Sequence, residues 1–186
     1  MANSIEILLE SGQTVFNVTD LAVLWQIKGT DTLKSKIYYL VKNNKLKRLH
    51  QGIFVLNEKF NKFELAGKLK NPSYISLETV LRQENVIFQY SSEITSVSNL
   101  NREYIIDDIK YTYRKIKDSI LFNAKGLEQN NFFTIATKER AFLDMLYLNK
   151  DYYFDNTDDI DWDKCKELVK IYDNKKLISR LDFFGK

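Results

Sequence analysis

The spacing of apolar positions in the first third of the chain predicts three short helices. In each of them apolar residues recur every three or four positions, which places them on one helical face. We expect Thr19 to cap the second helix, and Thr30, Asp31 or Thr32 to cap the third. The first helix stops at Gly12. The three predicted stripes fall at 5–9, 21–25 and 33–41.

A β-hairpin is expected directly after the third helix. Residues 46–49 and 53–56 read as strands on either side of a turn in which Gly52 supplies the positive φ. Three short helices followed at once by a hairpin are typical of a winged helix-turn-helix, whose third helix enters the major groove of DNA. The hairpin residues available to pack on the helices are Leu46, Leu49, Phe54 and Leu56.

After Asn57 the pattern predicts a mixed α/β domain. A linker helix at 58–70 and a helix capped by Ser76 are followed by alternating segments that favour strands. A helix capped by Thr137 and a final helix from about 162 to 177 end the chain. The predicted strands cover 93–99, 102–116 and 120–125, with another just before Thr137. The expected fold is therefore α+β, with a winged helix-turn-helix at 1–57 and an α/β domain at 58–186.

Composition narrows the class of protein. Apolar residues make up 44% and charged residues 28% of the 186 residues, as in ordinary globular proteins. No apolar run approaches the roughly 20 residues that cross a bilayer, and the N-terminal residues carry acids where a secretory signal carries bases. We expect a cytoplasmic protein with no membrane partner. Cys165 is the single cysteine, so we expect a half-buried helix residue, with no disulfide and no paired-thiolate metal site.

Charge is unevenly distributed along the chain. The first 57 residues hold seven bases and four acids, a net charge of +3, which equals the net charge of the whole chain. All seven bases follow residue 27, and only one acid accompanies them. This asymmetry predicts a polyanion-binding segment in front of an electrically balanced one.

Polar and cationic side chains of the third helix and of the hairpin are the candidate DNA contacts. They point away from the apolar stripes and can reach bases or phosphates, which makes binding sensitive to salt. A solvated helix surface would carry the same residue types, so the order of the elements decides in favour of DNA. His50 has no second histidine or nearby cysteine, which argues against a metal or catalytic role. The candidates are Thr32, Lys34, Ser35, Lys36 and Tyr39 in the helix, and Lys47, Arg48, His50 and Gln51 in the hairpin.

Motifs for catalysis are missing from the sequence. It contains no G-x-S-x-G segment, phosphate-cradling glycine loop, histidine metal cluster or Cys-His pairing. Residues 151–163 hold six aspartates and no base, but they lack the ligand pattern of an EF-hand and are interpreted as a solvated loop. We therefore predict a protein that is not an enzyme and needs no cofactor or metal.

Four segments together resemble the AbiEi antitoxin family of bacterial abortive-infection toxin–antitoxin systems. They are FNVTDLAVL, LKRLHQGIFVLNE, PSYISLETVL and IATKERAFLDMLYL, between residues 16 and 148. The resemblance implies a winged-helix DNA-binding domain and a C-terminal mixed α/β domain. It also implies repression of the protein's own operon through inverted repeats in its promoter, and neutralisation of a nucleotidyltransferase-like toxin. Such antitoxins are generally thought not to form a stable complex with the toxin, so a direct complex is not assumed.

The resemblance places the DNA contacts on the same helix and hairpin residues. In one respect the chain departs from the family, because Lys138 stands where the family helix often has a proline. Two alternatives stay open: the winged helix binds a partner protein instead of DNA, and the oligomeric state on DNA is undetermined. The most basic run of the second domain is a candidate antitoxin surface, although the solvated side of a strand would look the same. It consists of Lys110, Arg114, Lys115 and Lys117.

Overall fold

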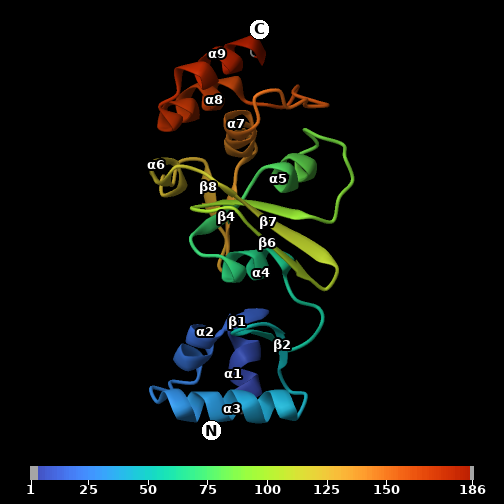
Figure 1. The fold of residues 1–186 in the computed structure, drawn as a ribbon, viewed down its shortest axis with the longest axis vertical. Coiled ribbons are helices and arrows are strands. Elements are labelled where there is room, and N and C mark those ends of the chain that lie inside the picture. Colours follow the sequence, from blue (N-terminus) through green and yellow to red (C-terminus); the bar gives the residue numbers. More distant parts are fainter. Residues whose placement is uncertain (1–3, 185–186) are drawn as a thin grey trace. The chain divides into compact units, whose positions relative to one another are not determined.

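The structure is a computed structural model that describes residues 4–184 and has a mixed α+β fold (Figure 1). Within these residues the chain forms nine α-helices, one 3-10 helix and two β-sheets. It divides into two compact units, Met1–Leu69 and Lys70–Lys186, here called the N-terminal and C-terminal units. The first unit thus continues past the boundary expected after Asn57 and includes one more helix.

The N-terminal unit contains the three expected helices and the expected hairpin. It also contains a short strand between the first two helices, which the sequence pattern did not reveal. That strand pairs with the hairpin in an antiparallel sheet of order β1-β3-β2, so β2 lies at an edge. The elements are α1 (Ser4–Glu10), β1 (Val15–Asn17), α2 (Val18–Leu24), α3 (Thr30–Lys42), β2 (Lys47–His50), β3 (Ile53–Val55) and α4 (Lys62–Leu69).

The caps of α2 and α3 differ from those expected. Asn17 caps α2, because its Oδ1 accepts the Asp20 N–H at 2.8 Å while the Asp20 carboxylate accepts the Asn17 N–H at 2.8 Å. This reciprocal capping box satisfies two free amides, whereas a Thr19 cap would begin the helix later. Helix α3 starts after Gly29 with no side-chain cap, so none of its three candidate residues serves.

Apolar side chains of α1, α2, α3 and the hairpin meet in one core. Leu46 and Phe54 belong to it as expected, Leu56 packs against it, and Leu49 is half-buried. The carboxylate of Glu64 on α4, 2% exposed, accepts the N–H groups of Thr14 and Val15 at 2.8 and 3.0 Å. The buried members of the core are Leu8, Phe16, Leu21, Trp25, Leu33, Ile37, Leu40, Leu46 and Phe54.

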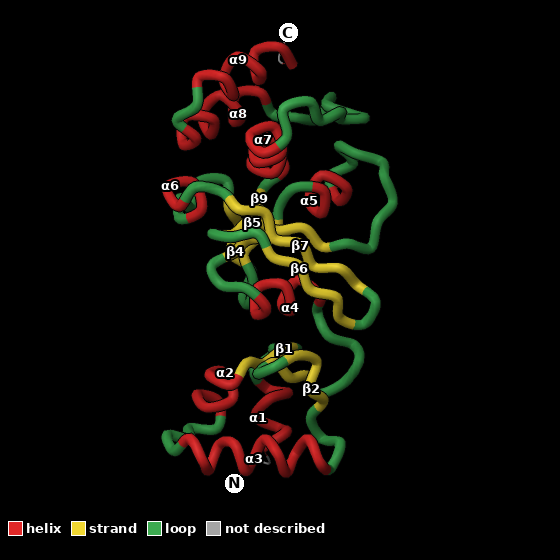
Figure 2. Tube along the Cα trace, in the orientation of Figure 1, coloured by secondary structure: helices red, strands yellow, loops and turns green. Residues whose placement is uncertain are grey.

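The C-terminal unit is built on a six-stranded mixed sheet of order β6-β7-β5-β4-β9-β8. Strands β5 and β7 are parallel, as are β4 and β9, and the other neighbours are antiparallel. Helices α5, α6 and α7 lie over one face of this sheet, and α8 and α9 pack against α7 (Figure 2). The strands are β4 (Ser73–Ile75), β5 (Ile94–Ser98), β6 (Arg102–Ile106), β7 (Ile109–Lys115), β8 (Leu127–Gln129) and β9 (Thr134–Ala136). The helices are α5 (Glu78–Gln83), α6 (Asp118–Leu121), α7 (Lys138–Leu148), α8 (Trp162–Leu168), η1 (Val169–Tyr172) and α9 (Lys175–Phe184).

Several expectations for this unit are corrected by the structure. Residues 120–125, expected as a strand, form the end of α6 and a turn, because one helical turn buries both Ile120 and Leu121. The final helix is broken at Asp173, whose left-handed backbone (φ 43°) ends the 3-10 turn. Asn174 then caps α9 by accepting the Leu177 N–H at 3.2 Å.

The expectations for three single residues of this unit have different outcomes. Thr137 caps α7 as expected, by accepting the Arg140 N–H at 3.3 Å. Ser76 is not a helix cap, since α5 begins two residues later and the hydroxyl of Ser76 is engaged elsewhere. Cys165 is fully buried instead of half-buried, and burial raises the pKa of its thiol to about 12. None of the helices within residues 4–184 has the length and apolar character needed to span a membrane.

Candidate nucleic-acid interface

Helix α3 buries one side and exposes a row of hydrogen-bonding side chains on the other. Leu33, Ile37 and Leu40 face the core, and at 3.6 residues per turn the opposite side carries residues spaced by three or four positions. Both tyrosines are largely exposed, Tyr38 by 66% and Tyr39 by 64%. The exposed row consists of Thr32, Ser35, Tyr38, Tyr39 and Lys42.

The two lysines predicted on α3 lie at the borders of this row. They are two residues apart, which separates them by about 200° around the helix. Lys34 is exposed, and its ammonium lies 3.9 Å from the Asp31 carboxylate. The ammonium of Lys36 instead lies 4.4 Å from the centre of the Trp25 ring, and desolvation lowers the pKa of this lysine. Lys36 therefore packs partly against Trp25, which directly follows α2, and the predicted α3 residues are not equally accessible.

The hairpin presents its bases on the edge strand β2. Lys47 and Arg48 are exposed, and they are consecutive residues of a strand, so their side chains leave opposite faces. The guanidinium of Arg48 lies 5.4 Å from the Phe54 ring directly across the ladder. The Lys47 ammonium pairs with the Glu58 carboxylate at 3.3 Å. That pair is exposed and weak, so a phosphate can replace the carboxylate.

The turn of the hairpin completes the set of predicted contacts. His50 and Gln51 are exposed, and Gly52 adopts φ 75°, which the tight turn requires. A bulge falls between Arg48 and His50 and increases the local twist of the ribbon. The Leu46 N–H, one residue before β2, donates to the Leu40 carbonyl of α3 at 3.3 Å, so the basic strand starts beside the C-terminal end of α3.

The chemistry of this surface suits a polyanion with hydrogen-bonding edges. Hydroxyl and phenol groups on α3 can bond to bases, and the flanking ammonium and guanidinium groups can neutralise phosphates. Comparison of the sequence with known protein families and with curated proteins finds no match to either. The case for this surface therefore depends on the residues of the chain itself.

The basic run predicted in the second domain is divided by the structure. Lys110 and Arg114 lie on one face of β7 and line a polar pocket of about 470 Å³, whereas Lys115 and Lys117 do not line it. The Lys110 ammonium contacts the carboxylates of Glu103 at 2.8 Å and Glu93 at 3.7 Å. The four bases do not form one cationic surface around this pocket, since two of them lie outside it and Lys110 is paired with acids.

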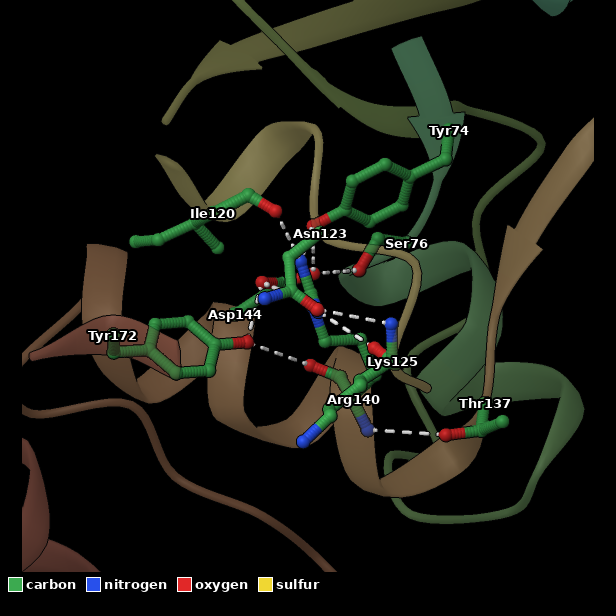
Figure 3. A network of polar contacts seen from close by, with 9 residues as sticks. All are labelled: Tyr74, Ser76, Ile120, Asn123, Lys125, Thr137, Arg140, Asp144 and Tyr172. Atoms are coloured by element: carbon green, nitrogen blue, oxygen red, sulfur yellow. Dashed lines mark hydrogen bonds and ion pairs between the residues drawn. The ribbon is translucent and has the colours of Figure 1, made fainter. Parts of the chain in front are cut away.

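A buried charged network in the C-terminal unit was not anticipated (Figure 3). Arg140 and Asp144 are one turn apart on α7, both 0% exposed, with Nε of the arginine 3.4 Å from Oδ1 of the aspartate. The carboxylate accepts the hydroxyls of Tyr172, Ser76 and Tyr74 at 2.6, 2.8 and 3.0 Å.

The guanidinium of Arg140 is also held by backbone oxygens. Its Nη1 donates to the Lys125 carbonyl at 2.7 Å, and Nη2 donates to the Ile120 carbonyl at 2.8 Å and to the Tyr74 hydroxyl at 3.0 Å. A charged pair at helical spacing inside an apolar helix was the only sequence signal for this site. The network ties α7 to β4, to α6 and to η1, which is a stabilising role.

Burial sets the pKa values of the acidic groups in this network. It raises the pKa of the Asp144 carboxyl, and the charge of Arg140 and the donated hydrogen bonds oppose that rise. Burial and the neighbouring Asp144 raise the pKa of both Tyr74 and Tyr172 well above the usual value for tyrosine. No cluster of three or more metal-ligand side chains occurs among residues 4–184.

Stability is expected to fall at alkaline pH because of these tyrosines. The folded-state pKa of Tyr172 exceeds the unfolded value of about 10, so above that pH only the unfolded state releases the proton. The stabilisation is complete below pH 10 and is lost as the pH rises toward the folded pKa. Above pH 10 the free energy of unfolding should fall less steeply with pH in Tyr172→Phe than in the unmodified chain, by up to about 1.4 kcal/mol per pH unit. Urea unfolding measured at several pH values checks this.

The matched control for this measurement is Tyr90→Phe. Tyr90 is 98% exposed, so its removal should leave the slope as it is in the unmodified chain. Equal slopes for the unmodified protein and Tyr172→Phe would contradict the expectation.

Proposed function

We propose that the N-terminal unit is a winged helix-turn-helix that binds double-stranded DNA. The observation that carries this proposal is the exposed row of α3 followed directly by a basic edge hairpin. The order of helices and strands, with β1 joining the hairpin, supports this proposal, which makes α3 the recognition helix and the β2–β3 hairpin the wing. In this arrangement Thr32, Ser35 and Tyr39 face base edges, while Lys34, Lys47 and Arg48 face phosphates.

We further propose that the chain is an autorepressor and antitoxin of the AbiEi type. In that role it binds inverted repeats in its own promoter and neutralises a nucleotidyltransferase-like toxin encoded beside it. Support comes from two of the segments that resemble the family, PSYISLETVL and KERAFLD. These two are more specific to the family than the helix-turn-helix and the hairpin, which many regulators share. Tyr74 and Ser76 of the first contact Arg140 and Asp144 of the second, so both segments serve one network of the C-terminal unit.

A second candidate function is a winged helix that grips a partner protein without binding DNA. The exposure of Tyr38 and Tyr39 favours it, since tyrosine is enriched at protein interfaces. The seven bases and one acid between residues 28 and 57 favour DNA, because a surface of that composition attracts phosphates. The charge argument is the stronger one, and a single experiment separates the two functions.

Electrophoretic mobility shifts with the DNA upstream of the coding sequence test DNA binding. We expect retardation of this duplex in preference to one of equal length and shuffled sequence. Affinity should fall steeply between about 50 and 200 mM salt, as counterions displaced by the lysines and arginine compete. Absence of retardation at low salt, or equal retardation of the shuffled duplex, would refute sequence-specific DNA binding. The protein-binding function would then be the better explanation.

A further inference from the structure

Helix α3 carries none of the side chains that most often recognise guanine or adenine through a fork of hydrogen bonds. Its sequence, TDTLKSKIYYLVK, contains no arginine, asparagine or glutamine. Arginine is the usual partner of guanine in the major groove, and asparagine and glutamine are the usual partners of adenine. The hydroxyl groups of serine and threonine bond to either purine. The exposed row of α3 must therefore distinguish base pairs in another way.

The three lysines of α3 lie beside other groups of the protein. The ammonium of Lys34 lies 3.9 Å from the Asp31 carboxylate, and that of Lys42 lies 6.0 Å from the centre of the Tyr38 ring. The third, Lys36, packs against an indole ring. Because these contacts hold the ammonium groups near the protein surface, we assign the recognition of bases to the uncharged side chains of the row.

Thr32 offers a methyl group near the N-terminal end of α3. The residue is exposed, and the N-terminal residues of a recognition helix are those that contact base edges. Its hydroxyl oxygen lies toward Gly29, one turn earlier, 3.4 Å from the point where a Cβ of that glycine would stand. The methyl group of the threonine is therefore available to a base. Its natural partner is the C5-methyl group that only thymine carries in the major groove.

Two further residues continue the same side of the helix. Ser35 and Tyr39 follow Thr32 by three and seven positions, which is the spacing of one helical face. Tyr39 is 64% exposed, and an aromatic ring of this kind can pack on a thymine methyl group. The row thus presents apolar contacts that suit thymine and lacks the forked donor that suits guanine.

The turn of the hairpin carries side chains that favour an A·T-rich minor groove. His50 and Gln51 are exposed beside Gly52, whereas Arg48 lies 5.4 Å from the Phe54 ring before the turn begins. Glutamine can donate to the acceptors that A·T pairs present in the minor groove, where guanine adds an amino group. Narrow A-tract grooves also attract histidine. Both elements of the interface therefore favour the same base pairs.

We propose that the duplex recognised by the N-terminal unit is rich in A·T pairs. In the major groove α3 contacts thymine methyl groups through Thr32 and Tyr39, and in the adjacent minor groove the hairpin turn contacts A·T pairs through Gln51. The inference rests on the proposed DNA-binding function and adds the base composition of its target. Phosphate contacts are the same for duplexes of equal length, so the preference comes from these uncharged side chains.

Binding of the full chain to four alternating duplexes of equal length tests the inference. Their base pairs are A·T, A·U, I·C and G·C, where I is inosine. The A·U duplex lacks the thymine methyl group, and I·C combines the minor-groove acceptors of A·T with the major groove of G·C. We expect the A·T duplex to bind at least about tenfold more tightly than G·C, with A·U and I·C between them. Fluorescence anisotropy at a fixed salt concentration measures the four affinities.

Two variants assign the preference to the residues that carry it. Thr32→Ser keeps the hydroxyl and removes the methyl group, so it should reduce the ratio of A·T to A·U affinity by about fourfold. Gln51→Ala should reduce the advantage of I·C over G·C several-fold and leave the ratio of A·T to A·U unchanged. Both side chains are exposed, so the fold is retained, as circular dichroism will verify. Thr157→Ser, the same substitution at a half-buried position of the C-terminal unit, is the matched control.

The outcomes distinguish this inference from the DNA-binding proposal. Salt-sensitive binding of all four duplexes with equal affinity, or tighter binding of G·C, would overturn the inference and leave the proposal. An A·T to A·U ratio that is the same in Thr32→Ser and in the unmodified chain would also overturn it. Binding to none of the duplexes at low salt would overturn the inference and the DNA-binding proposal together.

Discussion

Alanine in place of Asp144 is expected to lower the free energy of unfolding of the C-terminal unit by about 3–5 kcal/mol. The substitution leaves the guanidinium of Arg140 fully buried without its countercharge, and a buried charge without a partner is costly. It also removes the acceptor for the hydroxyls of Ser76, Tyr74 and Tyr172. Urea unfolding followed by circular dichroism measures the loss.

Two further variants identify the charge as the cause. In the double variant Arg140→Met/Asp144→Leu no uncompensated charge remains, so the double variant should be more stable than Asp144→Ala alone. Asp163→Ala removes a carboxylate from an exposed pair with Lys166 and should leave the unfolding midpoint unchanged. This account would be contradicted if Asp144→Ala were as stable as the unmodified chain. It would also be contradicted if the double variant were less stable than Asp144→Ala.

The fold of the N-terminal unit was largely predictable because its determinants are local. The apolar periodicity of 33–41 and the glycine of the hairpin turn require no knowledge of distant residues, and both predictions agree with the structure. Strand β1 was missed because it has three residues and is defined by its pairing with β3, about forty positions later. The cap of α2 was misplaced by two residues, since Thr19 and Asn17 are both acceptable caps and Asp20 decides between them.

The C-terminal unit was predicted less well because distant contacts define it. Residues 120–125 have the composition of a strand, but packing of Ile120 and Leu121 against the rest of the unit favours a helical turn. The partners of Asp144 lie 68, 70 and 28 positions away, at Ser76, Tyr74 and Tyr172. No local pattern reveals such a network.

The accessibility of individual candidate contacts shows the same limit. Charge and periodicity placed Lys36 on the exposed side of α3, as they did Lys34. Its contact with the Trp25 ring depends on how α2 crosses α3, which a single helical wheel does not describe. Residue type therefore identified the cationic segment, and the structure was needed to rank its members.

Removing four bases of the candidate interface is expected to weaken DNA binding by about two orders of magnitude at physiological salt. Each neutralised phosphate contributes about 0.9 to the slope of log affinity against log salt, so loss of the three contacts proposed for Lys34, Lys47 and Arg48 reduces the slope by about 2.7 and the affinity about 10²-fold at about 0.15 M salt. Glutamine is the substitution of choice, because its stem still covers Trp25 where Lys36 stood. Mobility shifts over a range of salt concentrations measure both quantities. The substituted residues are Lys34, Lys36, Lys47 and Arg48.

A matched variant tests whether the loss of DNA affinity is specific to the surface formed by α3 and β2. Four exposed lysines of the C-terminal unit are replaced by glutamine, which changes the net charge by the same amount. If the long-range field of the whole protein governed binding, both variants would lose affinity alike; if contacts at α3 and β2 govern it, the salt slope of the control stays unchanged. Equal slopes for the two variants would therefore remove the basis for the DNA-binding proposal. The control residues are Lys115, Lys117, Lys166 and Lys175.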